Sequence, residues 1–150
     1  GGTTTDHWDT KLLRRLVVPF SPKAVCYYVG VNDMVSMGAT VEGLTAKIES
    51  LLLHTHEMLP DTHVFFIYIN VLPGYYEHFA PSIKQVNANV EAFMATQDGW
   101  CEGIKAGDAL LKENGLADAS YFRLDCIHMS EYGYVVWSKV IKKALQDYLG

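Results

Sequence analysis

Several features that mark large protein classes are missing from this sequence. No apolar run approaches the roughly 20 residues that a helix needs to cross a bilayer, and the run Val64–Ile69 is far shorter. The first residues contain neither the basic nor the apolar segment of a secretory signal. The three cysteines are odd in number and far apart, and no Asn-x-Ser/Thr sequon occurs, so nothing indicates a disulfide-stapled secreted protein. We therefore expect a chain with no membrane span in a reducing, cytoplasmic compartment.

Positive charge is also scarce. Lysine and arginine together number 12, against 17 aspartates and glutamates, which gives a formal net charge of −5. Because proteins that bind nucleic acid usually carry a basic patch for the phosphates, nucleic acid is not an expected partner. The sequence has no Gly/Ser-rich, Pro-rich or single-sign run, and 49% of its 150 residues are hydrophobic. This composition predicts one folded domain over residues 1–150.

Apolar residues follow two different periods along the chain. Residues 24–30 and 63–71 are short, β-rich and apolar on both faces, as strands inside a parallel sheet are. A short strand or turn is expected near residues 103–111. Apolar residues recur at helical spacing in three stretches, 40–60, 83–94 and 134–148. Because strands and helices alternate, the sequence predicts an α/β fold with a mostly parallel sheet.

Three short polar segments fall where such a sheet would place a site, since ligands bind at the carboxyl ends of its strands. The segment 30–33, Gly-Val-Asn-Asp, follows the first buried strand. The segment 125–128, Asp-Cys-Ile-His, precedes the last helix, and Gly-Gly-Thr-Thr begins the chain. Together these segments suggest acyl transfer.

Their residue types match the needs of a serine hydrolase. Such an enzyme uses a base that accepts the hydroxyl proton, a carboxylate that orients the base, and donors aimed at the oxyanion. His128 is the candidate base, and Asp125 is its candidate orienting partner. The side-chain amide of Asn32 and the backbone N–H of Gly2 are the candidate oxyanion donors.

The same segments resemble sequence blocks of the SGNH, or GDSL-like, hydrolases. Residues 30–33 are similar to the Gly-x-Asn-Asp block of that family, residues 2–5 to its Gly block, and residues 125–134 to its Asp-x-x-His block with a trailing Gly-Tyr. The resemblance spans the chain in the family's order. It implies a three-layer α/β/α fold with a flavodoxin-like sheet, no metal or organic cofactor, and small acyl esters as substrates.

The first block of that family, Gly-Asp-Ser, has no counterpart in this sequence. In the family this block lies on a strand before the Gly block and supplies the nucleophile. A strand with its crossover helix and the next strand takes roughly 30 or more residues, so the resemblance implies an N-terminally incomplete domain without its first strand–helix unit. The unit lies on another chain, has been truncated, or has been lost with reorganisation of the fold.

The missing serine leaves two functional hypotheses. In the first, the chain belongs to an esterase, lipase or deacetylase and is inactive alone, because the segment carrying the serine is absent. In the second, it is a degenerate, non-catalytic domain that binds a ligand or a partner protein. Unpaired strand edges would also allow a second copy to pair with the first, which makes a homo-oligomer a further expectation.

Simpler interpretations exist for some of these residues. Asp125 and His128 are also compatible with a loop hydrogen bond before a helix, and Gly2 with the remnant of a cloning site. Cys126 is expected to be structural, since a nucleophile and its base normally come from separate elements. Tyr75 and Tyr76 follow a strand end, where substrate-binding residues tend to gather, and they are the candidate substrate-binding pair.

Overall fold

A computed structural model describes residues 2–150 and contains a three-stranded sheet with the order β1-β2-β3. The strands are β1 (Ala24–Tyr27), β2 (His63–Ile67) and β3 (Cys101–Ile104). Both pairs are parallel: Ala24 is aligned with His63 at the start of the first pair, and Val64 with Cys101 at the start of the second. The predicted α/β class with a parallel sheet is confirmed.

Long helices connect the strands. Helix α3 (Val41–Met58) joins β1 to β2, α4 (Ala80–Ala95) joins β2 to β3, and α5 (Glu131–Leu149) follows the last strand. A helical N-terminal segment precedes β1. The remaining short elements are α1 (Thr5–His7), η1 (Trp8–Val17), η2 (Val18–Phe20), α2 (Val31–Val35), η3 (Gly74–Phe79), η4 (Ala106–Leu110) and η5 (Ala119–Tyr121).

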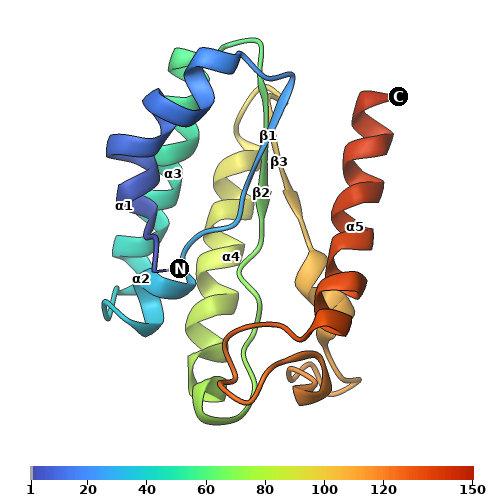
Figure 1. Ribbon diagram of the computed structural model, residues 1–150. Helices are drawn as coiled ribbons and strands as arrows, with labels where there is room; N and C mark the ends of the chain where they lie inside the picture. The colour runs from blue at the N-terminus through green and yellow to red at the C-terminus, as the bar shows by residue number, and fades with distance from the viewer. Residues whose placement is uncertain (1) are drawn as a thin grey trace.

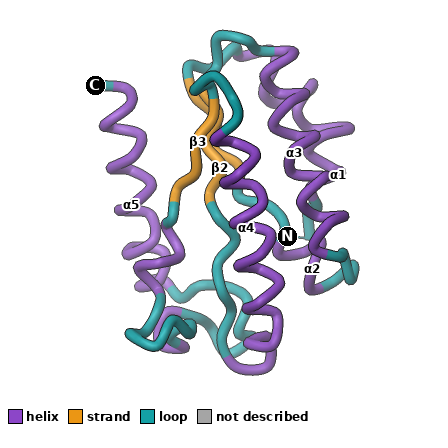
Figure 2. The backbone as a smooth tube through the Cα atoms, turned by 180° about the vertical axis from the view of Figure 1, so that it is seen from behind, coloured by secondary structure: helices purple, strands orange, loops and turns teal. Residues whose placement is uncertain are grey.

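The helices form unequal layers on the two faces of the sheet. Residues of α3, α4 and the N-terminal helix join one core cluster, whereas α5 packs on the opposite face. Figures 1 and 2 show α5 standing by itself, with α1 and α3 on the other side of the strands. The predicted three-layer arrangement is therefore confirmed.

The layer formed by α5 is thinly packed. Gly133 is its one fully buried residue, whereas α3 buries six residues and α4 buries five. Strand β1 shows the same weakness, because its first three residues are only half-buried, while the last four residues of β2 are buried. This side of the sheet has apolar surface that the described residues cover only in part.

Some boundaries differ from the sequence prediction. The strands end at Tyr27 and Ile67, earlier than the predicted limits at residues 30 and 71, and irregular buried chain continues toward the site. The helical segment 5–20 was not predicted, although polar and apolar residues are more clearly separated on η1 than on α3, α4 or α5; Leu13 and Val17 are its buried apolar residues. Among residues 2–150, no helix combines the length and apolar character needed to cross a membrane.

Replacement of Gly133 by alanine should destabilise the fold. A Cβ atom there would lie 2.1 Å from the carbonyl oxygen of Tyr121, so α5 would have to move away from the loop that precedes it. We expect Gly133→Ala to lower the free energy of unfolding by about 1–3 kcal/mol, the usual range for overpacking. Urea unfolding measures the change. Lys139→Ala, at an exposed position of the same helix, is the control, and equal losses in the two variants would contradict the steric explanation.

Candidate active site

A short loop before α5 brings Asp125 and His128 into contact. Nδ1 of His128 lies 2.8 Å from Oδ2 of Asp125. The other carboxylate oxygen, Oδ1, accepts the backbone N–H groups of Ile127 and His128, both at 2.9 Å. These bonds lower the pKa of Asp125 to about 2; the backbone N–H of His128 is the largest cause, followed by that of Ile127. Asp125 is thus held as a carboxylate that accepts a hydrogen bond from Nδ1–H, which leaves Nε2 free.

The backbone closes this loop on both sides. The N–H of Arg123 donates to the carbonyl of His128 at 2.8 Å, and the N–H of Ser130 donates to that of Tyr121 at 2.9 Å. Cys126 has a φ of 59°, in the left-handed region that non-glycine residues seldom adopt. It lies at the turn between the acid and the base, which fits the predicted structural role. The His128 side chain is 61% exposed and therefore accessible to a reactant.

The second part of the site lies at the carboxyl end of β1. Asn32, in α2, donates a hydrogen bond from Nδ2 to the carbonyl of Thr3 at 3.0 Å. An amide nitrogen carries two hydrogens, so one remains available for a substrate oxygen. Gly30 directs the chain into α2 with a φ of 109°, and a Cβ atom there would lie 2.5 Å from Cδ1 of Ile69. This position accordingly requires glycine.

Asp33 anchors the N-terminal segment beside Asn32. Its carboxylate is 1% exposed, and Oδ2 accepts both the backbone N–H of Thr5 at 2.9 Å and the hydroxyl of Thr5 at 3.1 Å. Oδ1 has no hydrogen-bond partner among the described residues and lies 3.9 Å from Nζ of Lys47. Asp33 thus holds Thr3–Thr5 in position, although sequence analysis had assigned it no more than a place in a motif.

Asn32 and His128 border the same hollow, which has a volume of about 160 Å³. Thr3 also lines it. Gly2, next to Thr3, is exposed and has a φ of 83°. The structure therefore brings three of the four predicted catalytic and oxyanion residues together, His128, Asp125 and Asn32, with Gly2 adjacent through the chain.

Tyr75 and Tyr76 lie in η3 rather than in the lining of this hollow. Tyr75 is 79% exposed, and Tyr76 packs against the main core. Their element nevertheless approaches the His128 loop, because a Cβ atom on Gly74 would lie 3.0 Å from Sγ of Cys126. The start of η3 is thus next to the His128 loop, while the two tyrosines do not line the hollow.

Two aromatic residues that sequence analysis did not assign to the site line the hollow. Tyr28 packs edge-to-face on Trp137, with ring centroids 5.0 Å apart, and Tyr134 contacts the same indole at 6.3 Å. Desolvation by burial raises the pKa of the Tyr28 phenol, which keeps it protonated. Tyr28 falls within the strand that the sequence predicts over residues 24–30, and only its position after the last residue of β1 could have indicated a place at the site.

No family model and no curated protein matches this chain. Solved structures do match it in fold. A carbohydrate esterase of family 3 from Talaromyces cellulolyticus has a TM-score of 0.81 at 15% identity, over 99% of this chain and 69% of the esterase. A GDSL-like lipase from Bacteroides thetaiotaomicron has a TM-score of 0.77 at 17% identity, over 99% and 73%. A lipase/acylhydrolase from Enterococcus faecalis has a TM-score of 0.73 at 20% identity, over 98% and 72%.

These likenesses establish the fold. The chain has the α/β fold of the SGNH and GDSL-like hydrolases, as its motifs predicted, and it spans about seven tenths of the length of these neighbours. Among residues 2–150, no three His, Cys, Asp or Glu side chains gather in a way that could hold a metal ion.

Asp125 should titrate well below an ordinary aspartate. Its pKa in the folded chain is about 2, whereas the unfolded value is about 3.9. The fold therefore favours the ionised form; the associated stabilisation is complete above about pH 4 and is lost as the pH falls toward 2. Carbon-13 NMR of the side-chain carboxyl measures the midpoint. A midpoint near 4, or one unaffected by loss of the His128 side chain, would contradict the assignment of the three hydrogen bonds.

Removal of the Asp33 carboxylate should loosen the start of the chain. Asp33→Ala leaves the N–H and hydroxyl of the fully buried Thr5 without their acceptor. We expect the free energy of unfolding to fall by about 1–3 kcal/mol and amide exchange at Thr5 to accelerate. Asp6→Ala is the control, because Asp6 is exposed and its ion pair with Lys47 is worth about 1 kcal/mol or less. Unchanged exchange at Thr5 in Asp33→Ala would refute the anchoring role.

Proposed function

We propose that this chain forms the base and oxyanion half of an SGNH-type ester hydrolase that acts on small acyl esters. The observation that carries the proposal is that His128, already oriented by Asp125, borders the same hollow as the Asn32 amide. A base and an oxyanion donor that border one small space are what acyl transfer needs. The fold supports the proposal, since its solved neighbours are esterases and lipases.

His128 is the general base in this proposal. With Nδ1–H donated to Asp125, Nε2 carries the lone pair and points away from the carboxylate. The low pKa of Asp125 keeps its negative charge, which stabilises the imidazolium that forms when Nε2 accepts a proton. Asp125 is a positioning residue, because its contacts are with the loop and the histidine rather than with the reactants.

Asn32 and Gly2 are the oxyanion donors. The Asn32 amide is already oriented by its hydrogen bond to Thr3, so its second N–H is directed before substrate arrives. Preorganised donors of this kind stabilise developing charge without reorganisation. The anchoring of Thr3–Thr5 by Asp33 also positions the adjacent Gly2. Because Gly2 has no side chain, the substrate has room beside its N–H.

The nucleophile in this proposal is a serine on a further strand that pairs with the outer edge of β1. The His63 N–H donates to the Lys23 carbonyl. With the register of the pair, this bond means that every second β1 residue, counted from Lys23, turns its backbone groups toward β2. The N–H and C=O groups of Ala24, Cys26 and Tyr28 therefore point outward. A strand added here would end beside the hollow, since parallel strands end at the same edge of the sheet.

A helix following that strand would cover the rest of the thinly packed face. Ala24, Cys26 and Tyr28 are only partly buried against the α5 side, and α5 buries only Gly133 completely. Helices pack on both faces of a parallel sheet, so a second helix beside α5 is the expected complement. Such a strand and helix would account for part of the length by which the solved neighbours exceed this chain.

The reaction then runs in two halves. The serine oxygen attacks the ester carbonyl carbon as Nε2 of His128 takes the hydroxyl proton, and the carbonyl oxygen becomes an oxyanion held by Asn32 and Gly2. Collapse breaks the ester bond, and the leaving alcohol takes the proton from His128. Water next attacks the acyl-enzyme while His128 takes its proton; the bond to the serine oxygen then breaks, His128 returns the proton to that oxygen, and the carboxylic acid is released.

The hollow favours a short acyl group. Its volume of about 160 Å³ equals roughly five water molecules at ~30 Å³ each. The Tyr28 and Tyr134 rings close one side of it. Acetyl and other short acyl groups fit this space, and Tyr75 and Tyr76, on the element that begins next to the His128 loop, would contact the alcohol portion of the ester.

Co-expression with a serine-bearing segment tests the proposal. The partner is the first strand–helix unit of the Talaromyces esterase or the segment encoded upstream of this chain, and the assay is hydrolysis of p-nitrophenyl acetate. We expect turnover to fall roughly 10³-fold or more in His128→Ala and about 10²–10³-fold in Asn32→Ala. Serine-to-alanine replacement in the added segment should abolish it.

His54→Ala is the matched control, because His54 forms a similar 2.6 Å contact with Asp9 on the opposite side of the fold, and it should keep full activity. If the added segment copurifies with the chain and no turnover appears, the hydrolase proposal fails and a binding domain is favoured. Turnover by the chain alone that requires His128 would overturn the assignment of the nucleophile to a further segment.

A further inference from the structure

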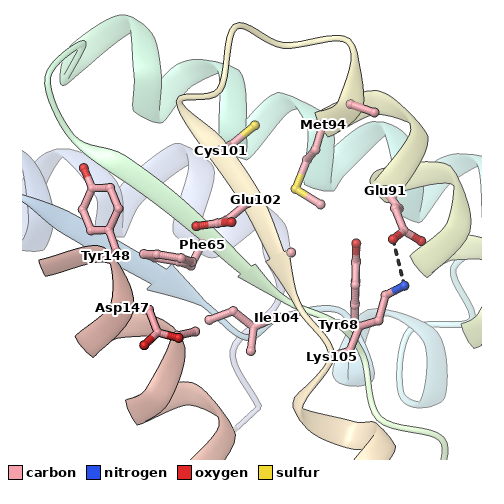
Figure 3. A pocket seen from close by; sticks show the side chains of 13 residues that line it. Phe65, Tyr68, Glu91, Met94, Cys101, Glu102, Ile104, Lys105, Asp147 and Tyr148 are labelled. Atoms are coloured by element: carbon pink, nitrogen blue, oxygen red, sulfur yellow. Dashed lines mark ion pairs between the residues drawn. The ribbon is translucent and has the colours of Figure 1, made fainter. Parts of the chain in front are cut away.

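A groove runs along the outer edge of β3, far along the sheet from the His128 loop. It has a volume of about 800 Å³ and lies between α4 and α5, with β3 as its floor. Figure 3 shows Met94 and Glu91 on the α4 side and Asp147 and Tyr148 on the α5 side. None of its lining residues borders the candidate active site, so the groove is a separate feature.

The floor of the groove presents unused backbone groups. The N–H of Val64 donates to the carbonyl of Trp100, and that of Tyr68 donates to the carbonyl of Ile104. With the register of the pair, Glu102 and Ile104 turn their backbone groups toward β2. Cys101 and Gly103 lie between them and turn theirs outward. Among residues 2–150, no strand pairs with this edge.

The two walls of the groove differ in chemistry. On the α4 side, the thioether of Met94, the methyl group of Ala95 and the ring of Tyr68 lie near the ion pair of Glu91 and Lys105. On the α5 side, Glu102 and Asp147 lie beside the ring of Tyr148. A strand bound to β3 would alternate its side chains between these walls, so it would meet apolar atoms and a compensated ion pair on one side and carboxylates on the other.

The groove has an excess of negative charge. Its lining includes three carboxylates, Glu91, Glu102 and Asp147, and one ammonium group, that of Lys105. Lys105 and Glu91 lie 2.9 Å apart and compensate one another. Lys143 contacts Asp147 from one helical turn away, and His63 contacts Glu102 at 3.1 Å. Glu102 is therefore the carboxylate of the lining without a lysine or arginine partner.

We propose that this groove binds an extended peptide segment of a partner protein by adding it as a strand to β3, and that the segment alternates basic and apolar side chains. Its backbone would pair with the outward groups of Cys101 and Gly103. Its lysine or arginine side chains would face Glu102 and Asp147, while the intervening apolar side chains would contact Met94 and Ala95. Strand addition of this kind takes affinity from the main chain and specificity from alternate side chains.

A second copy of this chain fits the groove less well. Pairing β3 with the β3 of another copy would bring together two sets of Glu102 and Asp147 side chains, and like charges across a strand pair are unfavourable. It would also bring α5 of each copy against that of the other. Opposite charge on the added strand removes this repulsion.

Hydrogen exchange measured by NMR tests the proposal on the intact chain. The probe is a capped hexapeptide of alternating lysine and valine, and an alternating glutamate–valine hexapeptide is the control. We expect the lysine peptide to slow exchange at Cys101 and Gly103 by about tenfold, the effect of one backbone hydrogen bond. Glu102 and Ile104, which face β2, should not change, and the glutamate peptide should have no effect.

Two other outcomes would overturn the proposal. If the lysine peptide binds but the exchange rates at Cys101 and Gly103 stay the same, its binding is electrostatic and does not add a strand. If these two amides are already protected in the free protein and its mass in solution is that of a dimer, the occupant is a second copy.

Charge removal provides an independent check. Glu102→Gln combined with Asp147→Asn should weaken binding of the lysine peptide by roughly threefold or more, since each exposed ion pair contributes modestly. Glu42→Gln combined with Glu113→Gln removes the same charge at exposed positions outside the groove, and it should leave the affinity unchanged. Equal weakening by both pairs would mean that net charge, rather than the groove, attracts the peptide.

Discussion

Parallel pairing of β1 with β2 places the two halves of the candidate site at the same edge of the sheet. Beyond the last aligned residues, Tyr27 and Phe66, both strands continue as irregular chain in the same direction. The chain after β1 leads to Asn32, and that after β2 leads to Asn70. Asn70 lies 3.7 Å from the sulfur of Met129 and accepts a bond from Trp137 at 3.2 Å, which ties α5 and the His128 loop to the sheet.

Sequence alone was sufficient for those parts of the site that depend on neighbouring residues. Asp125 and His128 are three positions apart, so their contact follows from a single turn of chain. The location of Asn32 follows from a buried strand directly before it. The hydrogen bond between Thr5 and Asp33 joins residues 28 positions apart, and no pattern of neighbouring residues predicts such a bond. Tyr28 was missed for a related reason. The apolar pattern of the strand continues past Tyr27, so it does not show that pairing with β2 ends there.

The two outer edges of the sheet differ in what surrounds them. At β1 the exposed backbone is flanked by half-buried apolar side chains, which favours a permanent neighbour that buries them. At β3 the exposed backbone lies at the bottom of a groove with carboxylates on one wall, which favours a charged partner that binds reversibly. An unpaired edge is a liability in most proteins. The two proposals for these edges follow from this difference in surroundings.

The hydrogen bonds within the loop that carries Asp125 and His128 all join residues that are close in sequence. The longest spans, those from Ser130 to Tyr121 and to Ser120, cover nine and ten positions, and the others cover five or fewer. Closing such a short loop costs little entropy, and local contacts form quickly during folding. The contact between Asp125 and His128 thus depends on a short segment of chain and not on completion of the sheet, whereas the place of that loop beside Asn32 depends on the long-range bond from Asn70 to Met129.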